Sequence, residues 1–259
     1  KGLGRRNSWR RGFLGGLSMA LGLIAAAPSC SLVVDTTDVQ CNETISCGTG
    51  RVCSSDGLCI VDPASANSCT KTTDCVDAEG KFREFHYCRK DGGAAKGTCV
   101  PLKSPLCDVV EGGDYKADNV FFIGSIHPKT APPPDDEVGI SMEQSILVAA
   151  ADLKKINGLP PAPGQSGNRQ VVVIGCSDAG EQEPSVEAAT HLVDTVGVQA
   201  IIGGAFSSLA IKTATDVTIP KKVLFLTASG TSPLITGRAD KPSGSDVGLV
   251  WRTVPSEHS

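Results

Sequence analysis

Apolar runs rich in β-branched residues alternate with helix-like segments from Val120 to the end of the sequence, and this alternation limits the fold more than any other feature. Most runs are followed by a loop and then by a segment with helical periodicity. This pattern is typical of a parallel sheet whose strands are joined by crossover helices. The sequence therefore predicts an α/β fold, a doubly wound parallel sheet. Its strands are expected at Val120–Ser125, Gln170–Cys176, Val198–Gly203, Val223–Thr227 and Gly248–Thr253.

Three helices are expected between these strands. The first extends from about Glu137 to Ile156, the second from Pro184, a favoured first helical residue, to about Val196, and the third from Ser208 to Val217. Ser232-Pro233 marks a further helix start, with the serine as its cap. In the first helix, apolar residues at a 4-3-4-3 spacing predict one buried face, formed by Met142, Ile146, Ala149, Leu153 and Ile156.

The loops that follow the third and fourth strands are rich in glycine, serine and threonine. They lie in the segments VQAIIGGAFSSLA (198–210) and KKVLFLTASGTSPLIT (221–236). Open parallel sheets bind ligands at the carboxyl ends of their strands, and unpaired N–H groups and hydroxyls at neighbouring helix starts suit a carboxylate. The residues alone allow two interpretations: a ligand site, or serines that only cap a helix beside a solvated turn.

No catalytic or cofactor motif accompanies these loops. The sequence lacks H-E-x-x-H, G-x-S-x-G, a Walker loop and G-x-G-x-x-G, and its four histidines have no metal-ligand spacing. We therefore expect a binding protein and not an enzyme, with no metal and no cofactor. Nucleic acid is not an expected partner, because 28 acidic residues face 24 basic ones, five of which fall in the first 29 residues, and aromatic residues make up only 4%.

Residues 1–29 are typical of an export signal rather than of a folded domain. A basic start is followed by an apolar stretch from Phe13 to Ala27, which at about 15 residues is shorter than the roughly 20 that span a bilayer. Residues 10–14, RRGFL, resemble a twin-arginine signal, and residues 27–30, APSC, resemble a bacterial lipobox. The lipobox pattern makes Cys30 the lipidated first residue of the mature protein, with residues 30–40 as a tether. Ordinary cleavage beside an incidental cysteine is the alternative.

Residues 41–107 contain cysteines at an ordered spacing. We interpret them as two copies of a four-cysteine repeat: Cys41, Cys47, Cys53 and Cys59 in the first, and Cys69, Cys75, Cys88 and Cys99 in the second. Export favours disulfides, and repeats with so little apolar surface need two bridges each in place of a core. Four cysteines allow three pairings, among which the sequence does not choose. Zinc is the alternative, although no C-x2-C pair is present.

Two further cysteines, Cys107 and Cys176, lie just before the α/β region and at the end of its second predicted strand. A bridge between them would tie the repeats to the α/β region. The alternative is a buried free thiol at Cys176, which would behave as a small apolar residue.

Five segments of the α/β region follow one another in an order known from one protein family. They are MEQSILVAAADLKKING (142–158), VVVIG with Asp178 after it, AIIGGAFSS, LFLTASGTSP and VWRTVPSE (250–257). Together they resemble the first lobe of the type 1 periplasmic binding proteins of the leucine/isoleucine/valine (branched-chain amino acid) family. The resemblance covers residues 118–259 and says nothing about the small disulfide-rich module before them.

The resemblance implies two lobes that close over a ligand, of which residues 118–259 form the first. It implies that Ser207, Ser208, Ser229 and Thr231 hold the carboxylate and amino groups of a small amino acid or similar ligand. It also implies a solute-binding lipoprotein of the cell envelope, on the periplasmic or outer-membrane face, with an ABC permease as its partner. The alternative is a sensor or surface-interaction lipoprotein that uses the same fold without transport.

Two departures from the family pattern widen the range of expected ligands. The loop after the first strand reads His127-Pro128-Lys129-Thr130, where the family has P-L-T-G, and residues 236–247 form a longer polar loop. The expected ligand is therefore an amino acid or amide-like molecule and is not restricted to a branched-chain amino acid.

Overall fold

The structure, a computed structural model, describes residues 41–42, 47, 51–53, 57, 59–61, 67–164, 166–236, 238, 240 and 248–257. The chain divides into two units, residues 1–39 and 40–259, and all described residues belong to the second. The predicted export signal, Cys30 and the tether lie outside the described residues. Among the helices that are described, none is both long and apolar enough to cross a membrane.

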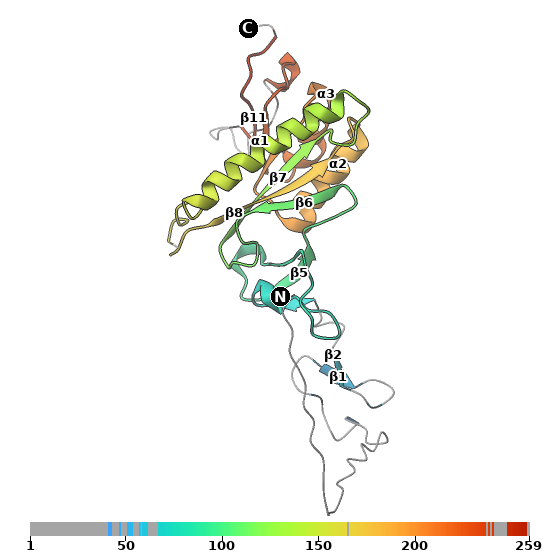
Figure 1. Cartoon of the computed structure of the whole chain (residues 1–259), viewed down its shortest axis with the longest axis vertical. Helices are drawn as coiled ribbons and strands as arrows, with labels where there is room; N and C mark the ends of the chain where they lie inside the picture. The colour runs from blue at the N-terminus through green and yellow to red at the C-terminus, as the bar shows by residue number, and fades with distance from the viewer. Residues whose placement is uncertain are drawn as a thin grey trace, which may run out of the picture. The chain divides into compact units, whose positions relative to one another are not determined.

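A six-stranded sheet forms the centre of the molecule, with strand order β11-β10-β9-β7-β8-β6 (Figure 1). Its strands are β6 (Cys107–Gly112), β7 (Val120–His127), β8 (Gln170–Ser177), β9 (Ala200–Gly203), β10 (Leu224–Thr227) and β11 (Val250–Arg252). All neighbours are parallel except β6, which pairs antiparallel with β8. The predicted α/β class and parallel sheet are thus confirmed, whereas β6 was not predicted.

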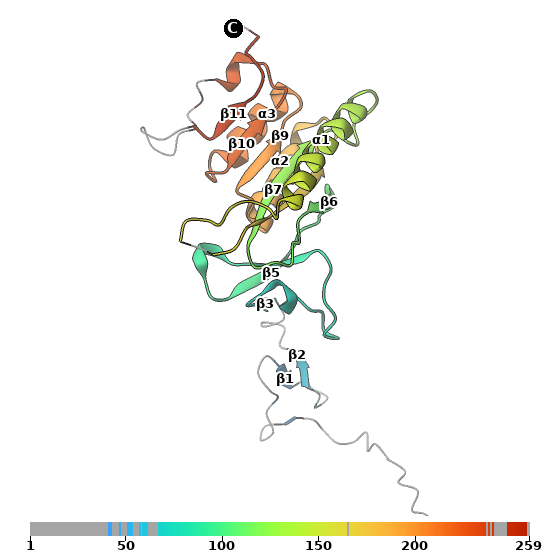
Figure 2. The ribbon, with the colours of Figure 1, turned by 60° about the vertical axis from the view of Figure 1, so that its left-hand side comes forward.

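Helices cover both faces of this sheet. On one face lies α1 (Asp135–Lys155), and on the other lie α2 (Gln182–Thr190) and α3 (Ser207–Thr213), which pack against each other (Figure 2). Each of these two continues into a π-helical segment, His191–Val196 and Ala214–Thr218. A short 3-10 helix, Pro233–Ile235, is capped by Ser232 Oγ, which accepts from Leu234 N, as the sequence predicts.

The apolar face predicted for α1 is wrong in its position around the helix. Ile156 is 68% exposed, and the buried residues of the helix are Gly139, Glu143 and Ala150. With the half-buried Ile146 and Leu153 these keep the 4-3-4-3 spacing, shifted around the helix. The face that packs on the sheet therefore contains a glycine and a glutamate, which a hydrophobic pattern cannot reveal.

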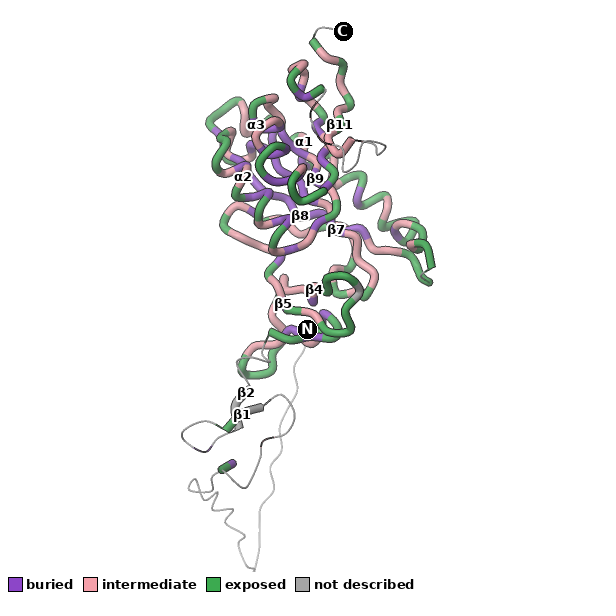
Figure 3. Tube along the Cα trace, turned by 180° about the vertical axis from the view of Figure 1, so that it is seen from behind, coloured by how far each residue is buried: buried purple, intermediate pink, exposed green. Residues whose placement is uncertain are grey.

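The core lies mainly between the sheet and the α2–α3 layer. In β8 the run Val171–Ile174 is at most 3% exposed on both faces, as its continuous apolar sequence predicts. Leu192, Ile201 and Phe225 are fully buried in the same cluster, which Figure 3 shows as buried segments of β8, β9 and the helices. This packing holds the parallel strands in register, so that their carboxyl ends meet at one edge.

The second cysteine repeat forms a small antiparallel sheet with strand order β3-β5-β4, built from β3 (Ser68–Cys69), β4 (His86–Arg89) and β5 (Gly97–Pro101). Short 3-10 helices, Thr72–Asp74 and Asp91–Gly93, lie in its loops. Its bridges are Cys69–Cys88 and Cys75–Cys99, first to third and second to fourth. The Sγ atoms of Cys69, Cys75 and Cys99 lie within 4.8 Å of one another, but bridged sulfurs are not the thiolates that zinc requires.

In the first repeat, β1 (Arg51–Cys53) pairs antiparallel with β2 (Cys59–Val61). Cys41 bonds to Cys53, again first to third, and Cys47 is also disulfide-bonded. The three repeat bridges whose partners are described, Cys41–Cys53, Cys69–Cys88 and Cys75–Cys99, therefore stay within their own repeats, as predicted. The structure supplies the pairing that the spacing left open.

A bridge also joins Cys107 to Cys176, as one of the two sequence interpretations proposed, and both residues are fully buried. Its role differs from the expected one. Cys107 opens β6 and lies opposite Cys176 of β8, so the bridge links neighbouring strands of the central sheet. It closes the edge of the α/β unit and does not tie the repeats to it.

Packing ties the second repeat to the α/β unit instead. Leu102 is fully buried in the main core, and the Tyr87 ring meets the Phe122 ring edge-on with 4.6 Å between centroids. Arg89 Nη1 donates to the carbonyls of Asp194 and Thr195 at the end of a helical segment, where a cation satisfies unpaired carbonyls. The second repeat is therefore continuous with the core of the α/β unit and not an independent module.

Candidate ligand-binding site

The carboxyl ends of β7 and β9 lie side by side, and the helices that follow them cover opposite faces of the sheet. β7 leads to α1 on one face, and β9 leads to α3 on the other. Such a point, where the winding direction reverses, is where open α/β sheets bind ligands, and we call the loops after β7, β9 and β10 the switch-point loops. The four predicted ligand residues follow β9 and β10: Ser207 and Ser208 begin α3, and Ser229 and Thr231 lie in the loop after β10.

Hydrogen bonds join the loop after β9 to the loop after β10. Ser229 Oγ donates to Ala205 O over 2.8 Å, and Ser232 N donates to Ser207 Oγ over 3.2 Å. The residue at the N-cap of α3 is Phe206, with no side-chain capping bond. Ser207 therefore does not cap its own helix, and the capping interpretation is wrong for this residue. The structure brings Ser207, Ser229 and the neighbouring Thr231 together.

Buried Thr227, at the end of β10, holds both loops and was not predicted as a site residue. Its hydroxyl donates to Gly204 O over 2.9 Å and accepts from Gly230 N over 3.0 Å. Gly204 has φ +68°, and a Cβ there would lie 2.6 Å from Ala210 Cβ, so only glycine fits this turn. Thr227 and Gly230 are buried, whereas Ala228 is exposed and Ser229 and Thr231 are half-buried, so the loop after β10 is fixed at two residues and partly exposed between them.

The hydroxyls of Ser207 and Ser229 can each still donate or accept a further hydrogen bond after these contacts are made. Ser207 Oγ accepts from the neighbouring loop and retains its own proton, which can be donated. Ser229 Oγ donates to Ala205 O and retains acceptor lone pairs. The N–H groups in the first turn of α3 have no partner within the helix. The switch-point loops therefore offer donors from Ser207 and α3 and an acceptor from Ser229.

Ser208 and Thr231 complete the predicted set. Ser208 is exposed on the first turn of α3. The carbonyl of Thr231 accepts from Glu257 N over 3.1 Å and from Arg252 Nη1 over 3.3 Å. That carbonyl is thus occupied, and Thr231 can offer a ligand its N–H and its hydroxyl.

Arg252 of β11 is a second residue that the sequence did not assign to the site. Its guanidinium also donates to Ser232 O over 3.0 Å and to Thr236 Oγ1 over 2.6 Å. A rigid donor fork thus fixes the loop after β10 from the far side. The signal was present in VWRTVPSE, where the arginine stands within a family-like motif, but its role required the fold.

A buried polar cluster lies under α1. Ser125 and His127 of β7 share a face with Gly175 of β8, and Glu143 of α1 rests on Gly175, where a Cβ would collide with its carboxylate. Lys129 Nζ lies 2.7 Å from Glu143 Oε1, with the two side chains 10% and 7% exposed. In the segment that departs from the family pattern, His127 is thus buried and Lys129 half-buried, and Lys129 links the loop after β7 to α1.

The His127 ring is 2% exposed and neither of its nitrogens has a hydrogen-bond partner among the described residues. Burial, and to a smaller degree the charge of Lys129, lowers the pKa of His127 from 6.5 to about 4. The imidazole is therefore neutral at physiological pH. It contributes packing at the end of β7 and no charge to a ligand.

The loop after β8 is attached to the loop after β7. Ser177 Oγ accepts from Thr130 N over 3.1 Å and lies 2.8 Å from Thr130 Oγ1. Asp178 is fully buried, and its Oδ1 accepts from Gly180 N over 2.9 Å. Burial raises the pKa of the Asp178 carboxyl, against the opposing effect of the Gly180 hydrogen bond. The loops after β7 and β8 are therefore fixed by side chains before any ligand arrives.

Comparisons with known proteins give similarity of structure only. No protein-family model and no curated protein sequence matches the chain. Three similar solved structures are the branched-chain amino acid transporter substrate-binding protein LivJ from Streptococcus pneumoniae with isoleucine (16% identity, TM-score 0.44), the leucine-binding protein LivK from Thermotoga maritima (23%, 0.41) and the leucine-, isoleucine-, valine-, threonine- and alanine-binding protein from Brucella ovis (15%, 0.43). Each match covers 53% of this chain and 33–34% of the other, so the chain spans about a third of their length.

Proposed function

We propose that the α/β unit is the first lobe of an exported solute-binding protein that captures a small amino acid or amide-like ligand for an ABC importer. The observation that carries this proposal is the pair of loops after β9 and β10, which Thr227, Ser207 and Ser229 join into one rigid receptor. A site whose polar groups are already held in place loses little conformational freedom when a ligand binds. The sequence resemblance of residues 118–259 to the first lobe of a binding-protein family supports the same function.

The hydrogen bonds already made within the receptor assign a role to each group. A ligand carboxylate would accept from Ser207 Oγ, from Thr231 and from the first-turn N–H groups of α3, with Ser208 at its exposed side. A ligand ammonium would donate to Ser229 Oγ, because that hydroxyl has already used its proton on Ala205 O. By the family resemblance, a second lobe closes over the ligand and supplies the remaining contacts.

Calorimetric titration of the full-length protein with single amino acids tests this proposal. Ser207→Ala and Thr231→Val each remove one hydroxyl with little change in shape, and losing a hydrogen bond to a charged group weakens binding about 10- to 150-fold. Ser145→Ala is the matched control, because Ser145 is exposed on α1 and donates only to Ser141 O within that helix. Unchanged affinity in both site variants, with binding intact, would place the ligand elsewhere.

A lipid anchor at Cys30 is part of the proposal and rests on the leader and the lipobox-like APSC. Mass spectrometry of the membrane fraction should find a diacylglyceryl group on the peptide that begins at Cys30. A mature protein that begins at another residue would contradict the anchor and leave the ligand-binding proposal untouched.

Ligand sensing without transport is the second candidate function. It is favoured by the second cysteine repeat, which is built onto the α/β unit through Leu102 and Arg89 and is more than an importer component needs as a tether. Uptake of labelled ligand separates the two functions. Cells that lack the protein should lose uptake if it serves an importer, and should keep uptake but lose the response to the ligand if it is a sensor.

A further inference from the structure

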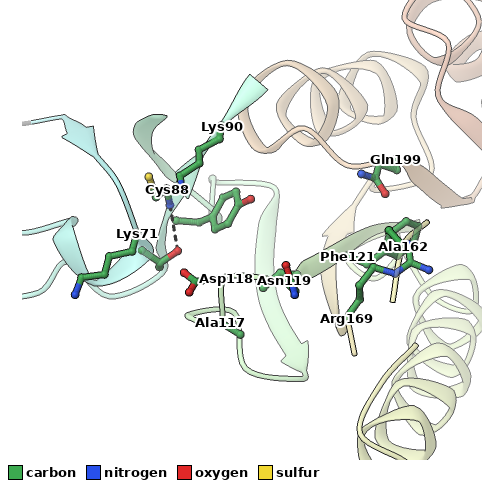
Figure 4. A pocket seen from close by; sticks show the side chains of 13 residues that line it. Lys71, Cys88, Lys90, Ala117, Asp118, Asn119, Phe121, Ala162, Arg169 and Gln199 are labelled. Carbon is green, nitrogen blue, oxygen red and sulfur yellow. Dashed lines mark hydrogen bonds between the residues drawn. The ribbon is translucent and has the colours of Figure 1, made fainter. Parts of the chain in front are cut away.

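A polar cavity of about 410 Å³ lies at the other end of the sheet, between the second cysteine repeat and the amino ends of the strands. Its volume falls in the range of roughly 300–1,000 Å³ that small-molecule sites occupy. In Figure 4, one side is formed by Lys71, Cys88 and Lys90 of the repeat, the other by Phe121, Ala162, Arg169 and Gln199, with Asp118 and Asn119 between them. Because Gln199 and Arg169 precede β9 and β8, this cavity is separate from the candidate ligand-binding site at the carboxyl ends.

Arg169 is held in place on this cavity at three points. Its backbone exchanges two hydrogen bonds with Leu159, at 2.8 and 2.9 Å. Its Nε donates to Pro160 O over 3.0 Å, and its guanidinium lies 5.4 Å from the centroid of the Phe121 ring. No hydrogen bond within the described residues uses its two terminal nitrogens. A guanidinium held in this way, with both terminal amino groups unused, suits bidentate binding of an oxyanion.

Several of the other lining groups are polar and have unused hydrogen-bonding capacity. Within the described part of the chain, the side chains of Lys90, Asp118 and Gln199 make no hydrogen bond or ion pair, and Asn119 uses only its Nδ2, which donates to Ser166 O. Among the lining residues, Lys71, Lys90 and Arg169 carry three positive charges against one on Asp118. The cavity is therefore electropositive, and it offers amide and carboxylate groups that bind hydroxyls.

This lining selects a class of ligand. These amide, carboxylate and guanidinium groups favour a molecule covered with hydroxyls over an apolar one, because an apolar ligand would cover them without pairing them and would bind weakly. The excess positive charge favours a ligand that carries an anion. A single fixed arginine matches one carboxylate, with the hydroxyls left for Asp118, Asn119 and Gln199.

We propose that this cavity is a second binding site, for a hexose-sized polyol with one carboxylate, that is, a sugar acid. Arg169 holds the carboxylate, Lys90 adds charge, and the amide and carboxylate groups hold the hydroxyls. The same chemistry is present in a free sugar acid and in one unit of an acidic glycan. Because β4 and the amino ends of β7 and β9 both line the cavity, its ligand would also bridge the cysteine repeat and the α/β unit.

Titration of the whole chain with D-glucuronate tests the site. D-Glucose, which has the hydroxyls but no carboxylate, and inorganic phosphate, which is an anion without the sugar hydroxyls, are the control ligands. We expect one glucuronate per chain, with both other compounds at least about tenfold weaker. Arg169→Gln should weaken glucuronate binding about 10- to 150-fold, as loss of a charged hydrogen bond predicts. Arg169→Lys should restore only part of the affinity, because it keeps the charge but not the fork.

Three further variants make the result decisive even if Arg169 variants fold poorly. Lys90→Gln alters an exposed residue and should weaken glucuronate binding, whereas Lys154→Gln, an exposed lysine near the end of α1, should not. Ser207→Ala should leave glucuronate binding unchanged, so the two sites can fail separately. A galacturonate tetramer that binds more tightly than monomeric galacturonate would assign the site to a glycan, and equal affinity of the two would assign it to the free acid. No glucuronate binding, phosphate binding as tight as glucuronate binding, or equal affinity in Lys90→Gln and Lys154→Gln would overturn the proposal.

Discussion

Acid should destabilise this fold through His127. The ring is buried under α1 with both nitrogens unpartnered, and its pKa falls from 6.5 in the unfolded chain to about 4 in the folded one. Between these values the unfolded chain binds the proton and the folded chain does not, so stability is lost as the pH falls from about 6.5 towards about 4. Lys129 faces the ring as a cation and opposes its protonation further.

The size of this effect follows from the two pKa values. The difference between the two pKa values corresponds to at most about 3.4 kcal/mol in the free energy of unfolding. Between about pH 7.5 and about pH 5, His127 should lower this free energy by about 2 kcal/mol. Asp178 acts in the opposite direction, because its raised pKa means that the folded chain takes up a proton more readily as the pH falls. The His127 contribution therefore has to be isolated by a variant and not read from the wild-type protein alone.

The measurement is the free energy of unfolding in urea at both pH values, for the wild type and for His127→Gln. The variant keeps a neutral polar side chain that does not titrate, so its stability should fall by about 2 kcal/mol less than that of the wild type over this interval. Ser145→Ala is the control, since Ser145 is exposed on α1 and does not titrate, and its pH dependence should match that of the wild type. Parallel pH curves for the wild type and His127→Gln would refute the reasoning.

Three further predictions concern the residues that hold the sheet and the switch-point loops in place. Replacing Cys107 and Cys176 together by alanine opens a loop of 69 residues and should lower the free energy of unfolding in urea by about 4 kcal/mol. Removing the Cys69–Cys88 bridge, which closes a loop of 19 residues, should lower it by about 3 kcal/mol. A smaller loss for Cys107–Cys176 than for Cys69–Cys88 would contradict the chain-entropy argument. Gly175→Ala should displace the Glu143 carboxylate from the sheet and lower the free energy of unfolding by about 3 kcal/mol. A double-mutant cycle with Glu143→Ala should show that the two losses are strongly non-additive, whereas additive losses would mean that the two residues do not contact each other. Arg252→Met should speed amide hydrogen exchange in residues 229–236 while leaving β8 protected, and unchanged exchange there would show that Arg252 does not hold the loop.

Local sequence was sufficient to predict most of the strands and helices. The runs at Val120, Gln170 and Leu224 form strands within two residues of their expected limits, and Ser232 caps a helix as predicted. These features depend on neighbouring residues: β-branched runs favour extended backbone, and a serine before proline favours a helix start. The strand β6 was missed because its sequence, CDVVEG, is short and polar, and its position follows from pairing with β8.

The candidate site was only partly predictable. The order of the loops indicated that Ser207, Ser229 and Thr231 share one edge, and the structure places them there. The roles of Thr227 and Arg252 were not visible, because each acts on residues from another loop through hydrogen bonds that exist only after the strands have paired.

The sequence by itself determined the period of each element, the parallel α/β class and the presence of disulfide-rich repeats, since these follow from residue types at short range. Only the tertiary structure decided which face of α1 is buried, which cysteines pair and which hydroxyls remain available to a ligand. A buried Glu143 is tolerated because Gly175 leaves space for it and Lys129 neutralises it, and all three come from different elements. Contacts of this kind depend on shape and charge brought together across the sheet, which no local pattern contains.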